Sequence, residues 1–374
     1  MTLSQIITVL EAWAPPAYQE SYDDCGLQVG RTDAEITGAL VALDVTENVV
    51  EEAAERGCNL IIAHHPLLFK GIKRLSATGS ETERILWQAV KHDISIYAIH
   101  TNLDNMVHGV NAMFAEKIGL NNTRILAPQE GTLLKLQTYV PATAAAQVRE
   151  ALFAAGGGAI GAYRECSFES AGKGSFRPLE SANPAIGTAG GPREIVEEVK
   201  LEVLVPRHLQ QPVLLALRKA HPYEEVAYEL IPLVNTNEHQ GAGMVGELTR
   251  ALSPGDFLAL LKEKLGTPCI RHTAPVSVRE GSSEKAIQKV AICGGAGSFL
   301  LSNAIRAGAD AFVTGDFKYH EFFGADGRLL IADVGHWESE QYTTDLIITQ
   351  LRQKLPNFAA HPAKSQTNPV HYYF

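Results

Sequence analysis

The sequence has few of the residues that mark disulfide-bonded or membrane-spanning proteins. Its five cysteines are odd in number, widely spaced and without a CxxC pair, which argues against a disulfide framework and against a thiolate zinc site. No apolar run approaches the length that a bilayer requires. The N-terminus lacks the basic stretch and unbroken apolar core of a signal peptide. We therefore expect a cytoplasmic protein with no membrane partner.

Basic residues are also fewer than acidic residues. The 374 residues include 32 lysines and arginines against 42 aspartates and glutamates, a formal net charge of −10. Nucleic-acid binding draws most of its affinity from basic surfaces, so a nucleic-acid partner is disfavoured. Apolar residues make up 45% of the chain and charged residues 20%, which are values of a globular protein. A chain of this length is expected to form two or three domains.

The two outer parts of the chain alternate predicted strands with predicted helices. In the first part we expect strands at 37–45, 60–63 and 94–99, and helices at 47–56, 81–91 and 109–118. After about residue 240 the same alternation resumes, with strands at 289–292, 311–314 and 329–333 and a last helix to about residue 351. This order predicts an α/β fold, in three layers, with helices covering a sheet.

The middle of the chain follows a different order. Predicted strands at 133–140, 198–205 and 225–233 are interleaved with helices at 142–155 and 209–219, and residues 156–192 are rich in glycine, alanine, serine and proline. This order fits a ferredoxin-like α+β module. We therefore predict a discontinuous main α/β domain, formed by residues 1–128 and 237–374, with an inserted domain at 129–236.

Imidazoles and carboxylates follow several of the predicted strands. His336 and Glu340 are four residues apart, so they share one face of a helix. His64 and His65 end one upstream strand, and Asp104 follows the next. Three nitrogens and two carboxylates suit zinc, iron, manganese or nickel better than calcium. Five ligands exceed what one tetrahedral ion needs, so we predict two divalent ions with open coordination positions.

Several neighbouring residues admit two interpretations. His100 can bind a metal directly or orient another ligand. Asp316 and His320 either line the site or belong to a polar loop, and Glu338 and His320 are candidates for moving protons. Residues 294–298, which lack the lysine of a P-loop, form either a tight turn or a weak phosphate site. The sequence identifies no catalytic residue with certainty, and no Ser–His–Asp or Cys–His arrangement is evident.

Six segments together resemble a known family. They are residues 24–30 (DCGLQVG), 63–67 (AHHPL), 100–104 (HTNLD), 293–298 (CGGAGS), 314–316 (TGD) and 335–340 (GHWESE). The chain is similar to the Nif-three-like dinuclear-metal proteins, some of which are called GTP cyclohydrolase 1 type 2 homologues. The resemblance implies that His64, His65, Asp104, His336 and Glu340 hold two metal ions, with Glu340 near both. It also implies a toroidal homohexamer and, from residues 221–226 (HPYEEV), a PII-like or CutA-like insert.

Two classes of function are consistent with these features. The first is a metal-dependent hydrolase of a nucleotide or a related phosphorylated small molecule, for which the resemblance suggests opening of the GTP ring. The second is non-catalytic and consists of metal storage or delivery, or of a regulatory assembly that senses a ligand through its insert. The sequence does not choose between them.

Overall fold

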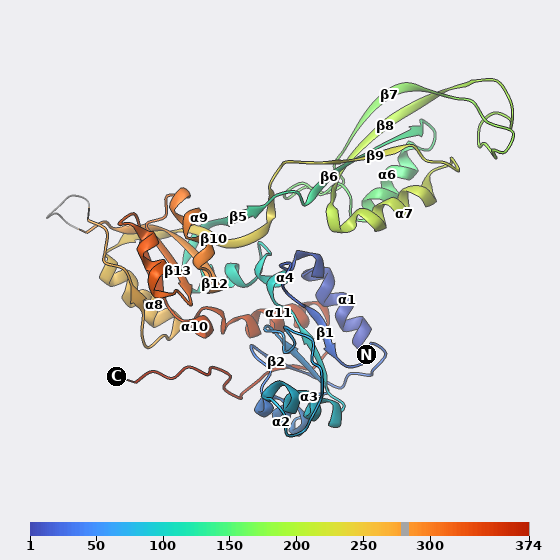
Figure 1. Cartoon of the computed structure of the whole chain (residues 1–374). Coiled ribbons are helices and arrows are strands. Elements are labelled where there is room, and N and C mark those ends of the chain that lie inside the picture. The colour runs from blue at the N-terminus through green and yellow to red at the C-terminus, as the bar shows by residue number, and fades with distance from the viewer. Residues whose placement is uncertain (278–283, 374) are drawn as a thin grey trace. The chain divides into compact units, whose positions relative to one another are not determined.

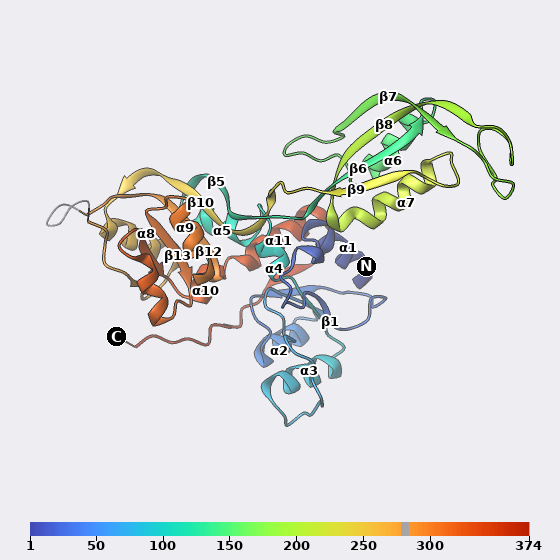
Figure 2. The same cartoon turned by 45° about the horizontal axis from the view of Figure 1, so that its top comes forward.

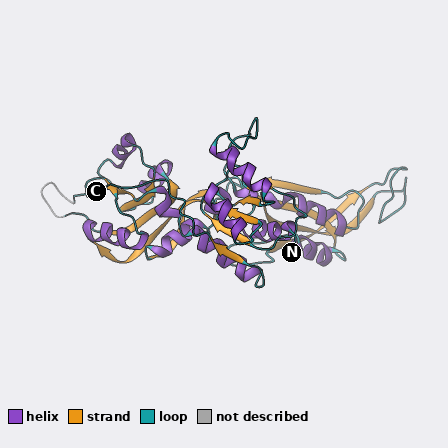
Figure 3. Ribbon diagram, turned by 90° about the horizontal axis from the view of Figure 1, so that it is seen from below, coloured by secondary structure: helices purple, strands orange, loops and turns teal. Residues whose placement is uncertain are grey.

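The computed structural model describes residues 1–277 and 284–373 of the chain (Figure 1). The chain divides into two compact units. The main unit consists of Met1–Ala127 and His239–Phe374, and the inserted unit consists of Pro128–Glu238. Helices and strands occur in both units (Figure 3). No helix in the described part of the chain combines the length and the apolar character needed to cross a bilayer.

One sheet of the main unit has five strands and lies between two layers of helices. Its central strands are parallel, as expected for four-residue runs that are buried on both faces. One face packs on α1 (Leu3–Trp13) and α11 (Thr343–Lys354), and the other on α2 (Glu47–Glu55) and α3 (Glu81–Lys91). The strand order is β1 (Gly26–Val29), β4 (Ser95–Ala98), β3 (Leu60–Ala63), β2 (Ala39–Ala42) and β15 (Ala360–Pro362).

A second, separate sheet of the main unit has six strands. Helices α5 (Val110–Lys117) and α8 (Pro254–Leu265) pack on one face, and α9 (Leu301–Arg306) and η4 (Tyr319–Ala325) on the other. The strand order is β11 (Arg271–His272), β14 (Leu330–Asp333), β13 (Ala311–Gly315), β12 (Ile287–Ala296), β10 (Asn237–Leu252) and β5 (Leu120–Gln129). Strands β12, β13 and β14 are parallel, while β10 is antiparallel to β12 and β11 is antiparallel to β14.

The inserted unit is a four-stranded antiparallel sheet with two helices. Its elements follow the order β6 (Leu133–Pro141), α6 (Ala145–Ala154), β7 (Ser167–Phe176), β8 (Glu194–Pro206), α7 (Gln210–Ala220) and β9 (Tyr228–Pro232). The strands lie in the order β7-β8-β6-β9 (Figure 2). Both helices pack on the same face of the sheet, where Val148 and Leu217 are buried against Leu136 and Val203.

The structure differs from the sequence expectation in two respects. The sequence predicts one layer of strands in the main unit, whereas the structure has two sheets, each with helices on both faces. Several strands are absent from the sequence prediction, β7 and β10 among them; for residues 156–192 the composition indicates loops or a hairpin. Both β7 and β10 contain glycines and polar residues of low β-propensity, and β7 is almost fully exposed. Pairing with neighbouring strands, rather than local preference, therefore makes these segments extended.

Candidate metal centre

The imidazoles and carboxylates converge within the main unit, beyond the carboxyl ends of parallel strands. His64 and His65 follow β3, and Asp104 ends the short helix α4 (Thr101–Asp104) that follows β4. His336 and Glu340 belong to α10 (His336–Glu340), which follows β14 of the other sheet. In open α/β sheets ligands bind beyond this end of the strands, because loops from neighbouring strands meet there.

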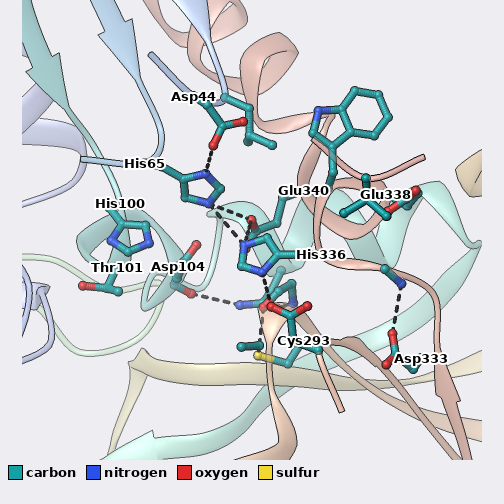
Figure 4. Close-up of a pocket in the computed structure, with 18 of the residues that line it drawn as sticks. Asp44, His65, His100, Thr101, Asp104, Cys293, Asp333, His336, Glu338 and Glu340 are labelled. Carbon is teal, nitrogen blue, oxygen red and sulfur yellow. Dashed lines mark hydrogen bonds and ion pairs between the residues drawn. The ribbon is translucent and has the colours of Figure 1, made fainter. Parts of the chain in front are cut away.

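All five predicted ligands are brought together, in two groups that share Glu340. The first group contains His64 and Asp104, and the second contains His65 and His336. Glu340 Oε2 lies 3.1 Å from Nε2 of His65 and 3.1 Å from Nε2 of His336. Glu340 Oε1 lies 3.8 Å from Nε2 of His64, which is 3.6 Å from Asp104 Oδ1. Figure 4 shows His65, Asp104 and His336 arranged around Glu340.

The Nδ1 atom of each of these imidazoles has a protein partner, which leaves Nε2 directed at the cluster. His64 Nδ1 lies 2.9 Å from the carbonyl oxygen of Ile99. His65 Nδ1 lies 2.7 Å from Asp44 Oδ1, and His336 Nδ1 lies 2.7 Å from Asp316 Oδ2. Such acceptors select the tautomer that presents Nε2 as a ligand. Asp44 is absent from the sequence prediction because only the fold brings it to His65.

Two buried polar atoms at the centre of the cluster have no hydrogen-bond partner. These are His64 Nε2 and Asp104 Oδ1. Burial of polar atoms without a partner is costly, and a cation between them would remove that cost. The donor set of imidazoles and carboxylates is that of zinc, iron, manganese or nickel sites. The residues present therefore fit divalent metal ions.

His100 lies beside the cluster and is held by a buried aspartate. Its Nδ1 is 3.0 Å from each carboxylate oxygen of Asp23, which also accepts hydrogen bonds from the Thr101 backbone and from Cys25 Sγ. Burial would raise the pKa of Asp23, but the hydrogen bonds from His100 and Thr101 hold it well below its usual range. His100 is close enough to His64 and His65 to share an ion with them. Asp23 directly precedes the 24–30 motif, yet nothing in the sequence links it to His100.

The cluster opens into a cavity of about 890 Å³. Asp316 and Glu338 line it. His320 is exposed on η4, stacks on Phe323 and is not among the lining residues, so the structure does not bring it to the site. The lining includes seven carboxylates and Arg271, which is paired with one of them, Asp333.

The glycines at 294–295 make room for Glu340. Gly295 has a φ of +60°, and a Cβ on it would lie 2.5 Å from Glu340 Oε1 and 3.2 Å from His336 Cε1. Its backbone N–H donates to Ser339 Oγ rather than pointing at an open anion site. These contacts favour the tight turn over the phosphate site, because the missing Cβ of Gly295 leaves space for Glu340.

The charges of the cluster are strongly coupled. Burial lowers the pKa of His64 to about 4. Burial also acts against protonation of His65 and His336, but hydrogen bonds with Asp44 and Glu340 raise the pKa of His65 to about 10, and Glu340 and Asp316 raise that of His336 to about 9. Without metal, both rings are therefore protonated near neutral pH.

Metal binding is consequently expected to release more than one proton per chain at about pH 7, because a metal ion can bind Nε2 only after the proton leaves. The apparent affinity for metal should fall roughly tenfold for each unit by which the pH is lowered, for each proton displaced. In the metal-free protein, the stabilisation from the two protonated rings is complete below pH 6.5 and is lost as the pH rises through about 9 to 10. Calorimetry in two buffers of different ionisation enthalpy measures the protons released. The Asp44→Asn variant should release fewer protons on metal binding than the wild type. Release of equal numbers by the two proteins would contradict this account.

Known proteins resemble this chain in sequence and in fold. A model of the family Duf34/NIF3 (NGG1p interacting factor 3) matches residues 1–369. A "GTP cyclohydrolase 1 type 2 homolog" from Bacillus subtilis is 41% identical over 337 residues, covering 89% of this chain and 87% of the relative. One from Staphylococcus aureus is 35% identical and covers all of both chains. The crystal structure of a Bacillus cereus protein related to NIF3 superimposes with a TM-score of 0.84 at 36% identity, covering 100% of this chain and 99% of the other.

The fold and the residues at the strand ends thus define an α/β protein with several sheets and with clusters of histidine and carboxylate side chains that could bind metal. The chain belongs to the Duf34/NIF3 family.

Proposed function

We propose that this protein binds two divalent metal ions and uses them to hydrolyse a nucleotide or a related phosphorylated small molecule. One ion would be held by His64, Asp104 and Glu340, and the other by His65, His336 and Glu340. The observation that carries the proposal is the position of Glu340, whose two oxygens face different ligand groups. Paired ions at such a carboxylate supply an activated water and stabilise a developing oxyanion.

The protein's own residues would orient the metal ligands. Asp44 and Asp316 hold the rings of His65 and His336 through their Nδ1 atoms. His100, fixed by Asp23, is placed to accept or return a proton at Nε2. A cavity of about 890 Å³ lies within the size range of small-molecule sites. Its lining is rich in carboxylates, so an anionic substrate would need cations at the cluster.

The proposal also covers the inserted unit, the oligomeric state, the metal and the first substrate to test. The order of elements in the inserted unit and its strand order β7-β8-β6-β9 favour a ferredoxin-like, PII- or CutA-like domain at about residues 129–236. We propose that the two flanking segments form one discontinuous main domain. A cytoplasmic homohexamer, and zinc, iron, manganese or nickel as the metal, complete the proposal. GTP is the first substrate to test, because curated relatives carry the name "GTP cyclohydrolase 1 type 2 homolog".

The proposal is tested by metal analysis followed by activity screening. The protein is purified without oxygen, its native metal is identified, and the metal-loaded form is assayed with GTP and a panel of phosphate esters. We expect two ions per chain and turnover of at least one compound that stops when the metal is chelated. Turnover of none of them by fully loaded protein would refute the hydrolase.

Metal delivery is the second candidate. The His336 side chain is 38% exposed, so an ion held there has a route to solvent. Transfer of metal from the loaded protein to an acceptor protein, without turnover of any compound in the panel, would favour this candidate.

A further inference from the structure

Glu338 is a buried carboxylate that the proposed metal centre leaves unused. It lies on α10 between His336 and Glu340, but residues two apart on a helix do not share a face. In Figure 4 its carboxylate lies apart from the group formed by His65, His336 and Glu340. Only 4% of Glu338 is exposed, yet it lines the cavity. Glu338 is therefore a buried carboxylate in the wall of the cavity.

The hydrogen-bond partners of the Glu338 carboxylate are neutral and come from the C-terminal tail, defined here as residues 363–373. Asn368 Nδ2 lies 3.4 Å from Glu338 Oε1, and the Tyr372 hydroxyl donates a second hydrogen bond. In residues 1–277 and 284–373, no lysine, arginine or histidine forms an ion pair with Glu338. A carboxylate accepts about four hydrogen bonds, so roughly two acceptor positions remain.

A second carboxylate of the same cavity has a different environment. Asp333 is paired with Arg271 and also accepts hydrogen bonds from the backbone N–H groups of Phe317 and Gly335. Its charge is thus compensated within the protein. The charge of Glu338 is not compensated by a basic group of the described residues. Burial of such a carboxylate is costly unless hydrogen-bond donors reach it. A molecule bound in the cavity can supply the remaining donors.

The surroundings of Glu338 favour a flat ring. The aromatic side chains of Trp337 and Tyr372 line the same cavity and offer faces on which a heteroaromatic ring can stack. The two oxygens of a carboxylate lie side by side, so they match two adjacent N–H donors on one ring edge. The lactam–amine edge of guanine presents such a pair. Adenine presents a donor beside an acceptor, and hypoxanthine lacks the amine.

We propose that Glu338 is a specificity-determining residue that accepts two hydrogen bonds from the lactam–amine edge of a guanine-type ring. Asn368 and Tyr372 act as positioning residues, because they hold the carboxylate in place. The tail itself is anchored by Glu52, which accepts hydrogen bonds from the backbone N–H groups of Lys364 and Ser365. This inference rests on the proposed function, since it assigns the nucleotide-like substrate of the same cavity.

The test compares the binding of guanosine, inosine and adenosine to the metal-loaded, full-length protein by calorimetry. Nucleosides carry no phosphate, so contacts between phosphate and metal do not contribute. We expect guanosine to bind at least about tenfold more tightly than the other two. Glu338→Gln, which replaces one acceptor oxygen by a donor, should weaken guanosine binding by roughly 10–100-fold and abolish the preference. Its metal content and circular dichroism should equal those of the wild type.

Variants of the tail provide a second measurement that does not alter α10. Tyr372→Phe and Asn368→Ala should each weaken guanosine binding by a few fold, with adenosine binding unchanged. Tyr373→Phe is the matched control, because the Tyr373 side chain is fully exposed, and it should behave as the wild type. The inference is overturned if the wild type does not prefer guanosine, or if Glu338→Gln binds it normally.

The outcomes separate this inference from the proposed hydrolase. A guanosine preference that disappears in Glu338→Gln, in a protein that turns over no compound, would support the inference and refute the hydrolase. Turnover of phosphate esters that is equally fast in wild type and Glu338→Gln, without a guanosine preference, would support the hydrolase and refute the inference.

Discussion

Glu340→Gln is expected to abolish the binding of both metal ions. The substitution keeps the size of the side chain but removes the charge that both ligand groups share. Burial would raise the pKa of Glu340, but hydrogen bonds with His336 and His65 and the nearby His64 ring hold it well below its usual range, so the carboxylate is ionised in the metal-free site. Loss of affinity should exceed the roughly 100-fold that removal of an outer partner of a ligand can cost. Metal analysis after dialysis measures the effect.

Asp316→Asn is the matched control for this change. Asp316 contacts the cluster through Nδ1 of His336, and its own side chain is 55% exposed. Affinity for metal should fall by roughly 10–100-fold, while two ions still bind at saturating concentration. If Glu340→Gln instead retains one tightly bound ion, Glu340 serves a single ion and the shared site is wrong. Retention of both ions would remove Glu340 from the centre altogether.

Gly295→Ala is expected to give the second-largest effect, which is loss of metal binding without a change in any ligand. The new Cβ would lie 2.5 Å from Glu340 Oε1, and Glu340 is only 4% exposed, so the carboxylate has little room to move. Metal affinity should fall at least about tenfold, in line with the effect of misplacing a ligand. The measurement is thermal unfolding with and without metal, because a tightly bound ion raises the midpoint and a weakly bound ion does not.

Gly308→Ala separates this clash from the cost of the backbone conformation. Gly308 has a φ of +70°, close to the +60° of Gly295, but a Cβ on it would meet nothing within 4 Å. Both variants should lose roughly 1–2 kcal/mol of stability, because a side chain disfavours the left-handed conformation. Only Gly295→Ala should also lose the stabilisation by metal. Equal responses of the two variants to metal would mean that Gly295 has no role in the site.

The sequence predicted much of the site because the relevant signals are local. The spacing of His336 and Glu340 is a property of one helical turn, and His64, His65 and Asp104 each come after a strand that is buried throughout. The structure brings these five side chains together. Asp23 and Asp44 were missed because each acts on a histidine ring that only the fold brings near. The tail residues Asn368 and Tyr372 were missed for the same reason.

The sequence by itself determined the family, the alternation of strands and helices, and the five side chains considered as metal ligands. These follow from short-range patterns, namely buried four-residue runs, helical periodicity and ligand types after strand ends. Only the tertiary structure decided that the strands of the main unit form two sheets, that β7 and β10 are extended, and that His320 lies outside the cavity. The physical reason is that these outcomes depend on pairing and packing between distant segments, which local preferences do not encode. The position of Glu340 between two groups of histidines is likewise a product of that packing.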